Sequence, residues 1–546
     1  MRNGRAVTES DSRLHDVAIV GFGPVGQTLA LLLGRAGHDV IVLERWPSPY
    51  DLPRAAHFDH EIGRIFQAAG VGEEVRALTD PVRDDYEWRN AAGETLVRID
   101  WSRNGLSGWP TANFFSQPQL EAVLANAVEG LATVTLRRGC EVVDLEAGDT
   151  SVRLTANGAG DVRARYVIGA DGANSFVRST MATSVTDLGF FYDWLVVDVL
   201  PHDQAEWSPK NWQLCDPERP TTLVSGGPGR RRWEFMRLPH ENAEELNTPE
   251  AAWRLLEPWG RTPDNTTIER HTVYTFQARW VDRWREGRLF LAGDAAHQMP
   301  PFAGQGMCSG LRDAMNLAWK LGLVLDGRAD PALLDTYTSE RSEHVQHAIG
   351  MSMALGQVIC VLDPDAAAAR DERMIATGAD PRHALPATPP PVLGDGVLQR
   401  SADGTRAPDV GHLTPQYEVT HQGRTALLDD LTGGGFTILS DGAAPLAALD
   451  TADHDFLSGI GATIVPLYTD DAPAEGYTDE SGGYLAHLRE HGHVAAVVRP
   501  DFYLFGAAVD GAQLKALVVQ LRQQLWQPAA TAPSLPAPDQ PLATFD

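Results

Sequence analysis

The sequence predicts an α/β protein of three domains: one built on parallel βαβ units, an antiparallel sheet inserted into it, and a smaller α/β domain near the C-terminal end. A buried-strand pattern at residues 16–23 (DVAIVGFG), followed by a helical pattern and a second strand, predicts the first domain. Aromatic and β-branched runs separated by turns occupy residues 186–280 and favour the antiparallel sheet. Strand and helix patterns resume over residues 405–526, beyond a stretch rich in proline and alanine.

The length and charge of the chain narrow the classes of protein that it can be. Its 546 residues correspond to about three domains of roughly 100–200 residues each. The 45 lysines and arginines against 73 aspartates and glutamates give a net charge of −28. This charge excludes a nucleic-acid binder and argues against attachment to an anionic membrane. An anionic ligand stays compatible with it, because a local arginine or a helix N-terminus can bind such a group.

Cysteine usage and hydropathy indicate a cytoplasmic protein. The four cysteines are too sparse for a disulfide scaffold, and the absence of a C-x-x-C pair argues against a zinc ribbon or a dithiol site, so no metal is expected. No uncharged apolar run reaches about 18 residues, which predicts no membrane span. Residues 1–14 lack the apolar core of a signal peptide and are expected to form a disordered arm. The Pro/Ala-rich residues 527–546 are expected to form a flexible tail.

The first strand pattern ends in a G-x-G-x-x-G turn that opens a helix. Gly21 permits the tight turn, Gly23 lets the backbone approach a pyrophosphate, and Gly26 lets the helix pack closely on the strand. Pro24 begins the helix, whose N-terminus then faces the phosphates. Glu44 ends the second strand, where an acidic side chain binds ribose hydroxyls. This context predicts a Rossmann-like dinucleotide site, but the motif alone does not separate FAD from NAD.

Two further segments distinguish the two cofactors. At residues 165–178 a predicted strand runs into Asp171-Gly172. At residues 288–306 another strand runs into Gly293-Asp294, and the Gly304-Gln305-Gly306 turn follows before a helix. Together with the G-x-G-x-x-G turn, these motifs resemble those of the FAD-dependent aromatic hydroxylases, the single-component flavin monooxygenases. The resemblance covers most of residues 15–350.

The resemblance implies a role for each motif in binding FAD. Asp294 would bind the ribityl chain, and Asp171-Gly172 would lie near the pyrophosphate. The Gly304–Gly306 turn would place helix N-terminal amides beside the flavin, where they stabilise its negative charge when it is reduced. Arg54, in Pro53-Arg54-Ala55, would reach the flavin, and Gln117 would contact it from a helix start. The implied cofactor-binding residues are Gly21, Gly23, Pro24, Gly26, Glu44, Arg45, Arg54, Gln117, Asp171, Gly172, Gly293, Asp294, Pro301, Gly304, Gln305, Gly306 and Met307.

The resemblance also implies how the chain divides into domains. Larger members of the family carry a thioredoxin-like third domain without its redox cysteines. Residues 405–526 match that domain in length and strand order, and the Arg499-Pro500-Asp501 turn resembles theirs. A structural or oligomerisation role is therefore expected for it. The predicted division is an FAD-binding domain at 15–85, 115–185 and 281–362, a substrate-binding sheet domain at 86–114 and 186–280, a linker at 363–404, and the thioredoxin-like domain.

The activity implied by the family is hydroxylation of a phenol by NAD(P)H and O₂ through a C4a-hydroperoxyflavin. Stretches such as 230–239 (RRRWEFMRLP) and 304–321 look closest to 3-(3-hydroxyphenyl)propionate hydroxylases, so ortho-hydroxylation of such a compound is expected. Because function resides in the site rather than the fold, a larger phenolic or polyketide substrate stays open. A non-hydroxylating FAD reductase or redox sensor also stays open. The expected partners are a small phenol, O₂ and NADH or NADPH, and a homo-oligomer is compatible with the sequence.

No single acid or base for the phenol proton is legible in the sequence. His57, Asp59 and His60 follow the Pro-Arg-Ala turn, so one of them could face the ring, and a histidine suits proton transfer near neutral pH. A hydrogen bond at a helix start is the alternative role for them. Tyr192 belongs to an aromatic cluster that could line the substrate pocket, and Pro301 would lie in its flavin-side wall. The predicted catalytic residues are therefore His57, Asp59, Tyr192 and Pro301.

Two other features have simpler interpretations. His297 lies between two of the flavin motifs, and a structural hydrogen bond is at least as good an explanation for it as catalysis. The arginines of residues 229–237 (GRRRWEFMR) are predicted to form salt bridges on a sheet surface, because the chain is strongly acidic. One arginine in the pocket stays compatible with this interpretation.

Overall fold

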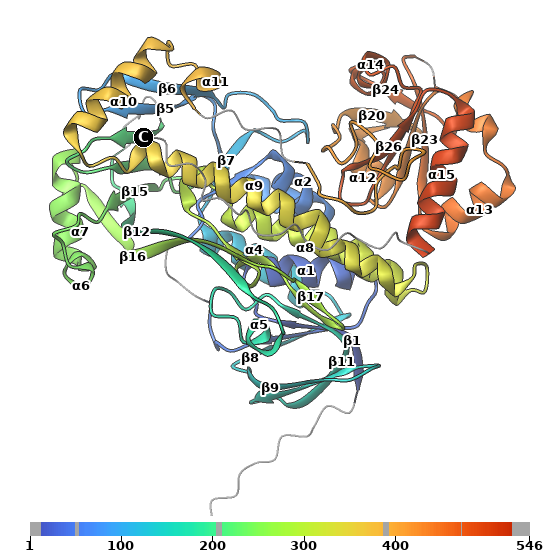
Figure 1. Cartoon of the computed structure of the whole chain (residues 1–546), viewed down its shortest axis with the longest axis horizontal. Coiled ribbons are helices and arrows are strands. Elements are labelled where there is room, and N and C mark those ends of the chain that lie inside the picture. Colours follow the sequence, from blue (N-terminus) through green and yellow to red (C-terminus); the bar gives the residue numbers. More distant parts are fainter. Residues whose placement is uncertain (1–12, 50–53, 204–209, 386–391, 471, 527–546) are drawn as a thin grey trace, which may run out of the picture.

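The computed structural model describes residues 13–49, 54–203, 210–385, 392–470 and 472–526 (Figure 1). The predicted flexible tail, Pro53 and nearly all of the predicted N-terminal arm lie outside these residues. Within them, no single helix is long and apolar enough to cross a membrane. One pair of helices bent by 112°, Pro331–Ile359 with Pro364–Ala376, passes that test together on length and composition.

A mainly parallel sheet forms the core of the first domain. Strand β1 (Leu14–Val20) pairs in parallel with β2 (Val40–Glu44) on one side and with β11 (Gly160–Gly169) on the other. The strand order is β17 (Arg285–Glu286), β18 (Leu289–Leu291), β11, β1, β2, β8 (Val134–Arg138), and β10 (Val152–Asn157) and β9 (Glu141–Ala147) continue from β11. The helices of this domain are α1 (Pro24–Arg35), α2 (His60–Ala68), α3 (Gly72–Ala77), α4 (Gln117–Glu129), α5 (Phe176–Thr180), α8 (Gly306–Leu325) and α9 (Thr336–Ile359).

The order of these strands brings three turns to one edge of the sheet. Strands β1, β11 and β18 run parallel, with Val20 beside Gly169 and Gly169 beside Leu291. Their carboxyl ends therefore meet, and this edge is where open α/β sheets bind ligands. The turns that follow are the G-x-G-x-x-G turn, the Asp171-Gly172 turn and the Gly293-Asp294 turn. Three motifs that are far apart in the sequence thus lie side by side.

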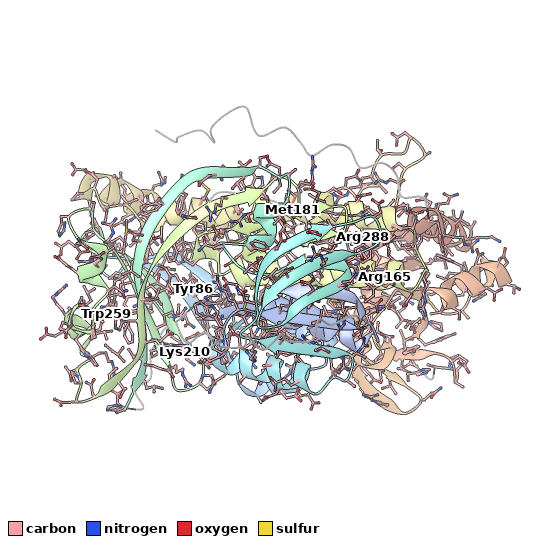
Figure 2. The ribbon with its side chains drawn as sticks, turned by 90° about the horizontal axis from the view of Figure 1, so that it is seen from below. Tyr86, Arg165, Met181, Lys210, Trp259 and Arg288 are labelled. Atoms are coloured by element: carbon pink, nitrogen blue, oxygen red, sulfur yellow. The ribbon has the colours of Figure 1, made fainter. Side chains whose placement is uncertain are left out.

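The second sheet is mainly antiparallel and stands beside the first (Figure 2). Its strand order is β19 (His297–Gln298), β16 (Thr266–Val281), β12 (Val185–Pro201), β15 (Arg231–Met236), β14 (Thr221–Ser225), β13 (Asn211–Cys215), β5 (Asp85–Asn90), β6 (Thr95–Asp100). Helices α6 (Ala243–Leu246) and α7 (Pro249–Leu256) belong to this part of the chain. In Figure 2, Lys210 and Trp259 are labelled in the part of the chain that carries this sheet, and Arg165 lies on β11 of the parallel one. A small sheet of β3 (His57–Asp59), β7 (Ala112–Phe114) and β4 (Asp80–Pro81) accompanies the first domain.

The segment 363–404, predicted as an extended linker, instead contains two helices. Helices α10 (Pro364–Ala376) and α11 (Pro381–Ala384) lie beside β5 and β6 in Figure 1. Each begins with a proline in its first turn after an aspartate whose side chain accepts a backbone N–H. Proline is favoured at that position and alanine throughout a helix, so the composition that indicated a linker also suits helices. Met374 is buried in the same apolar cluster as Trp88, which fixes α10 on the second sheet.

The third domain has a mixed sheet of its own. The strand order is β21 (Arg424–Leu427), β20 (Glu418–His421), β24 (Tyr477–Asp479), β23 (Thr463–Tyr468), β22 (Thr437–Asp441), β25 (Ala495–Val498), β26 (Leu504–Ala508). Its helices include α12 (Leu428–Thr432), α13 (Thr451–Gly459), α14 (Gly483–Glu490) and α15 (Gly511–Trp526). The four cysteines all precede this domain in the sequence, so it has no dithiol. Its likeness to thioredoxin stays a prediction.

A buried ionic cluster joins the third domain to the first. Arg499, from the predicted Arg-Pro-Asp turn, donates to Glu340 of α9 at 2.6 Å and to Asp501 at 2.7 Å. Lys320 of α8 donates to the same Glu340 oxygen at 2.7 Å. Burial raises the pKa of Glu340, but Arg499 and Lys320 outweigh burial and lower it to about 2. The four side chains are at most 3% exposed, so each charge depends on the others for its stabilisation.

Candidate active site

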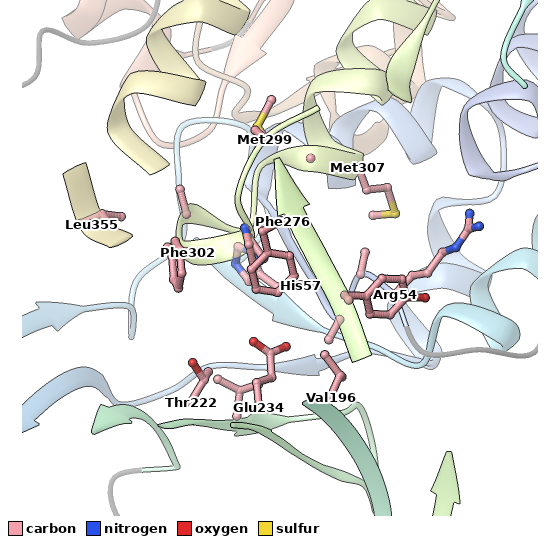
Figure 3. Close-up of a pocket in the computed structure, with 18 of the residues that line it drawn as sticks. Arg54, His57, Val196, Thr222, Glu234, Phe276, Met299, Phe302, Met307 and Leu355 are labelled. Carbon is pink, nitrogen blue, oxygen red and sulfur yellow. The ribbon is translucent and has the colours of Figure 1, made fainter. Parts of the chain in front are cut away.

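A cavity of about 960 Å³ lies between the parallel and antiparallel sheets (Figure 3). We name its two parts by their linings. The dinucleotide half is lined by Gly23, Pro24, Val25, Arg54, Gln117, Ala170, Gly172, Ala173, Ala292, Asp294, Gly304, Gly306 and Met307. The aromatic half is lined chiefly by His57, Tyr86, Trp88, Ile99, Trp101, Phe114, Val196, Gln213, Thr222, Val224, Arg232, Glu234, Tyr274, Phe276, Met299, Pro301, Phe302, Leu355, Pro381, Arg382 and Leu385.

The G-x-G-x-x-G turn forms a cradle that only glycine permits. Gly21 has φ +103°, and a Cβ there would lie 2.4 Å from the carbonyl oxygen of Ala170 in the neighbouring turn. A Cβ on Gly26 would lie 2.2 Å from the carbonyl oxygen of Gly21. Gly23 has no neighbour within 4 Å of that position and lines the cavity. No side chain caps the N-terminus of α1, so its amides are left to bind a phosphate group.

Glu44 lies at the end of β2, as predicted. Its carboxylate accepts the backbone N–H groups of Phe22 and Trp46, each at 2.8 Å, so it is held against the glycine turn. Arg45 is exposed, and its guanidinium lies over the ring of Trp46. Neither Glu44 nor Arg45 is among the residues that line the cavity.

The other two turns differ in which of their residues face the cavity. Asp171 accepts the backbone N–H groups of Phe176 and Val177, so this carboxylate caps α5 while its neighbour Gly172 lines the cavity. Asp294 lines the cavity, whereas the N–H of Gly293 points back to the Asp313 carboxylate at 3.0 Å. The third turn therefore presents Asp294 to a bound dinucleotide.

Asp313 organises the region behind the Gly293-Asp294 turn. Its carboxylate accepts hydrogen bonds from His297 Nε2 at 2.7 Å and from Arg341 Nε at 2.9 Å. Burial raises the pKa of Asp313, but His297 and Arg341 outweigh burial and lower it. His297 is thus a structural hydrogen-bonding residue, one of the two roles expected for it. The sequence analysis missed Asp313, although a charged residue within the apolar helix α8 was a visible signal.

Gln117 and Arg54 both reach the dinucleotide half, as predicted. The Gln117 Nε2 donates to Glu121 at 2.6 Å, and its Oε1 is buried with no hydrogen-bond partner among the described residues. A buried orphan acceptor is costly, which indicates that a ligand donor belongs opposite it. Arg54 lies at the edge of the cavity in Figure 3, and its carbonyl oxygen accepts a hydrogen bond from Arg232. The residues of this half therefore fit a bound dinucleotide.

The structure places Asp59 and the side chain of Gln305 away from the cavity. Asp59 caps α2 and accepts hydrogen bonds from Gln305 Nε2 at 3.1 Å and Arg312 at 2.7 Å. Arg312 also donates to Glu61, which accepts the hydroxyl of Tyr503 from the third domain at 2.8 Å. Burial raises the pKa of Asp59, but the adjacent Arg312 outweighs burial and lowers it. Asp59 thus serves the turn before α8 as an anchor, which is the helix-start role that the sequence left open.

His57 faces the cavity at the junction of its two halves. Its ring stacks on Trp101 with centroids 5.5 Å apart, and its Nε2 is buried with no partner among the described residues. Burial lowers the pKa of His57 to about 4, although Asp59 raises it in part. The imidazole is therefore neutral near pH 7. A neutral imidazole that lines a cavity can accept a hydrogen bond from a ligand hydroxyl at its unprotonated nitrogen.

Aromatic side chains of the second sheet, and of the segments that follow its strands β6 and β19, form the rest of the aromatic half. Tyr86 and Trp101 stack with centroids 4.3 Å apart, and Phe276 packs edge-on against Phe302 at 6.0 Å. Pro301 lines this half, as predicted. Tyr192 is not among the lining residues and instead packs on Phe190 at 4.9 Å. Tyr192 is paired across the sheet with Phe276 of β16, and it is Phe276 that lines the cavity.

Helix α11 and the residue that follows it, in the segment predicted as a linker, complete the aromatic half. Pro381, Arg382 and Leu385 line the cavity. Arg382 is largely exposed and pairs with Asp380 at 2.6 Å, so it lies at the rim. Sequence analysis missed this wall because the segment was interpreted as a connection between domains.

A glycine cradle for a dinucleotide that opens directly into an aromatic cavity defines a flavin-dependent oxidoreductase acting on an aromatic compound. The chain belongs to the family described as FAD binding domain, which matches residues 15–352. Residues 411–524 match the HcaD C-terminal domain. The protein is an FAD-dependent aromatic hydroxylase, as the sequence predicted.

Curated relatives match nearly the whole chain. A probable NADH-specific resorcinol 4-hydroxylase from Rhodococcus jostii is 40% identical, and the match covers 97% of each chain. A 3-(3-hydroxy-phenyl)propionate/3-hydroxycinnamic acid hydroxylase from Mycolicibacterium smegmatis is 33% identical over 90% of each chain. An enzyme of the same name from Klebsiella pneumoniae is 33% identical, and the match covers 92% of this chain and 94% of the relative.

Solved structures share the fold at lower identity. The flavin-dependent monooxygenase PieE, in complex with FAD and substrate, has a TM-score of 0.77 and 24% identity and covers 95% of this chain and 100% of its own. Aklavinone-11 hydroxylase, in a ternary complex with FAD and aklavinone, has a TM-score of 0.74 and 24% identity, with coverage of 94% and 100%. The predicted α/β class with a flavin hydroxylase fold is thereby confirmed.

Proposed function

We propose that this chain uses NADH and O₂ to hydroxylate a single-ring phenol at a carbon ortho to its hydroxyl group. The observation that carries the proposal is one continuous cavity in which an aromatic half adjoins the dinucleotide half. His57 lines it where the halves meet, and its Nε2 has no hydrogen-bond partner among the described residues. The names of the relatives support it, since resorcinol and 3-(3-hydroxyphenyl)propionate are both single-ring phenols and one relative is described as NADH-specific.

When bound, FAD supplies the redox chemistry: it accepts reducing equivalents from NADH and activates O₂. The chain's own residues bind and orient the reactants. The glycine cradle and the α1 N-terminus hold the pyrophosphate, and the N-terminal turn of α8 directs amides and a positive helix end toward the cavity. His57 Nε2 accepts a hydrogen bond from the phenol hydroxyl. This hydrogen bond raises the electron density of the phenol ring. Phe276, Phe302 and Met299 exclude water from the reacting carbon.

The test is a panel of phenols offered to the FAD-loaded protein with NADH and O₂. The panel contains resorcinol, 3-(3-hydroxyphenyl)propionate and one multi-ring phenol. We expect a single-ring phenol to stimulate NADH oxidation and to gain one oxygen atom, detected by mass spectrometry. NADH oxidation that no phenol stimulates, with hydrogen peroxide as the only product, would contradict the proposal. Oxygen inserted only into the multi-ring phenol would replace it with the larger-substrate alternative. Repeating the assay with NADPH tests the choice of nicotinamide.

A further inference from the structure

One acidic side chain enters the aromatic half from the second sheet. Of the described residues that line this half, Glu234 of β15 alone carries a carboxylate. In Figure 3 it rises from the sheet beside Thr222 and points toward the side of the cavity where His57 and Phe302 lie. Its side chain is 15% exposed, and burial raises its pKa while Arg232 lowers it in part. A carboxylate in this position faces whatever ring the cavity holds.

The nearest cation is committed to other groups. Arg232 donates to both oxygens of Asp198, at 2.7 and 3.0 Å, and to the carbonyl oxygen of Arg54. Its contact with Glu234 is longer, at 3.7 Å. Asp198 also accepts from Arg270 at 2.9 Å, so two arginines and two carboxylates form this group. Arg232 is therefore engaged chiefly by Asp198 and the Arg54 carbonyl oxygen, and it offers no guanidinium to a carboxylate on a ligand.

Gln213 and Thr222, two neutral polar residues that line the same half, are engaged in hydrogen bonds. Gln213 donates to the hydroxyl of Tyr86 at 2.6 Å, and Thr222 donates to the Gln213 carbonyl oxygen. The other cation at this half, Arg382, pairs with Asp380 at the rim. The Glu234 carboxylate is thus the strongest hydrogen-bond acceptor that this wall offers to a ligand, and an anionic ligand would meet it at close range.

We propose that Glu234 selects the substrate by charge: its carboxylate accepts a hydrogen bond from a hydroxyl on the ring and repels a ring that bears a carboxylate. The preferred substrate is then an uncharged phenol with a second hydroxyl rather than a phenolic acid. This inference rests on the proposed function and narrows its substrate class. A site built to accept a hydroxyl discriminates strongly against ligands that lack one, because its buried acceptor is left unpaired.

The test compares two ligands that differ in one substituent, resorcinol and 3-hydroxybenzoate, on the FAD-loaded protein. Their Kd values are measured by calorimetry for the wild type, for Glu234→Gln, and for Glu269→Gln as a matched control. Glu269 lies on β16 of the same sheet, pairs with Arg230 and does not line the cavity. We expect the wild type to bind resorcinol at least tenfold more tightly, Glu234→Gln to reduce that ratio at least tenfold, and Glu269→Gln to keep it.

Two results would overturn the inference: a wild type that prefers 3-hydroxybenzoate, or a Glu234→Gln ratio within twofold of the wild type. The first result is measured on the wild type, so it does not depend on whether a variant folds. Glu234→Met, which has a similar length, provides a second variant, and retained flavin absorbance shows that each variant is intact. Product analysis of the same samples separates the two proposals. Selective binding of resorcinol without oxygen insertion refutes the proposed function alone, and oxygen insertion with an unchanged ratio refutes the role of Glu234 alone.

Discussion

Replacing His57 with asparagine removes the imidazole to which we assign the hydrogen bond with the phenol, while keeping a polar side chain. A group that assists proton transfer contributes about 10²–10⁴-fold to rate. His57 belongs at the lower end of that range, because a pKa of about 4 makes it a weak base. We therefore expect the variant to hydroxylate about 10²-fold more slowly and to release more hydrogen peroxide per NADH, with FAD still bound. Single-turnover oxidation of the reduced enzyme, with product quantified by mass spectrometry, measures both effects.

The pH dependence of the wild type follows from the same burial. Burial lowers the pKa of His57 from its ordinary value of 6.5 to about 4, which corresponds to about 3 kcal/mol against the imidazolium. In the unfolded chain the ring takes up a proton below pH 6.5, but in the folded protein it does so only near pH 4. This residue's contribution therefore makes the folded protein less stable as the pH falls from 6.5 toward 4. The rate of hydroxylation should not fall through titration of His57 until the pH approaches 4.

The control is His60→Asn, the same substitution three residues further along. His60 bonds to Ser107 and does not line the cavity, so the variant should keep the wild-type rate. A wild-type inflection between pH 6 and 7 that disappears in His57→Asn would refute the reasoning, because the ring would then titrate normally. An undiminished rate in His57→Asn would refute its contact with the phenol.

Three further predictions concern the glycine cradle, the junction between the third and first domains, and helix α10. Gly26→Ala should yield protein without flavin absorbance, because its Cβ would lie 2.2 Å from the Gly21 carbonyl oxygen; a variant that purifies with a full complement of FAD would contradict this. Arg499→Met should cost about 3–5 kcal/mol by urea unfolding, because Glu340 loses a buried partner; an unchanged midpoint would show that the cluster stabilises little. Met374→Ala should cost about 2–5 kcal/mol and raise peroxide release, because it loosens the apolar cluster that contains the cavity residue Trp88; an unchanged ratio of peroxide to product would separate α10 from the active site.

The parts of the site that the sequence could predict are those set by local backbone demands. Gly21 is required by its positive φ, and Gly26 by the close approach of the Gly21 carbonyl oxygen. Both requirements arise within the same six residues. The Asp171-Gly172 and Gly293-Asp294 turns each follow a strand of the same parallel sheet. Their meeting follows from topology once the strands are recognised.

The parts that could not be predicted depend on partners distant in the chain. Asp59 turns away from the cavity because Arg312, far along the sequence, holds it. Arg232 was among the arginines predicted to form salt bridges on a sheet surface, and Glu234 was given no role. The ion pairs exist, as in Arg232–Asp198, but this stretch of β15 faces the cavity. Period-2 alternation shows which residues share a face, but it does not show which face is covered.

The junction between the third domain and α8–α9 also limits how these enzymes can be recombined. A chimaera that takes its third domain from a relative would need Lys320, Glu340, Arg499 and Asp501 to match, because a single mismatch buries an unbalanced charge. Tyr503 adds a second requirement, since it reaches Glu61 and through it the arginine that anchors the turn before α8. Apart from the buried Arg232–Asp198–Arg270 group, exchange of residues in the aromatic half meets no such constraint, so substrate range can diversify while the domain junction is inherited as one unit.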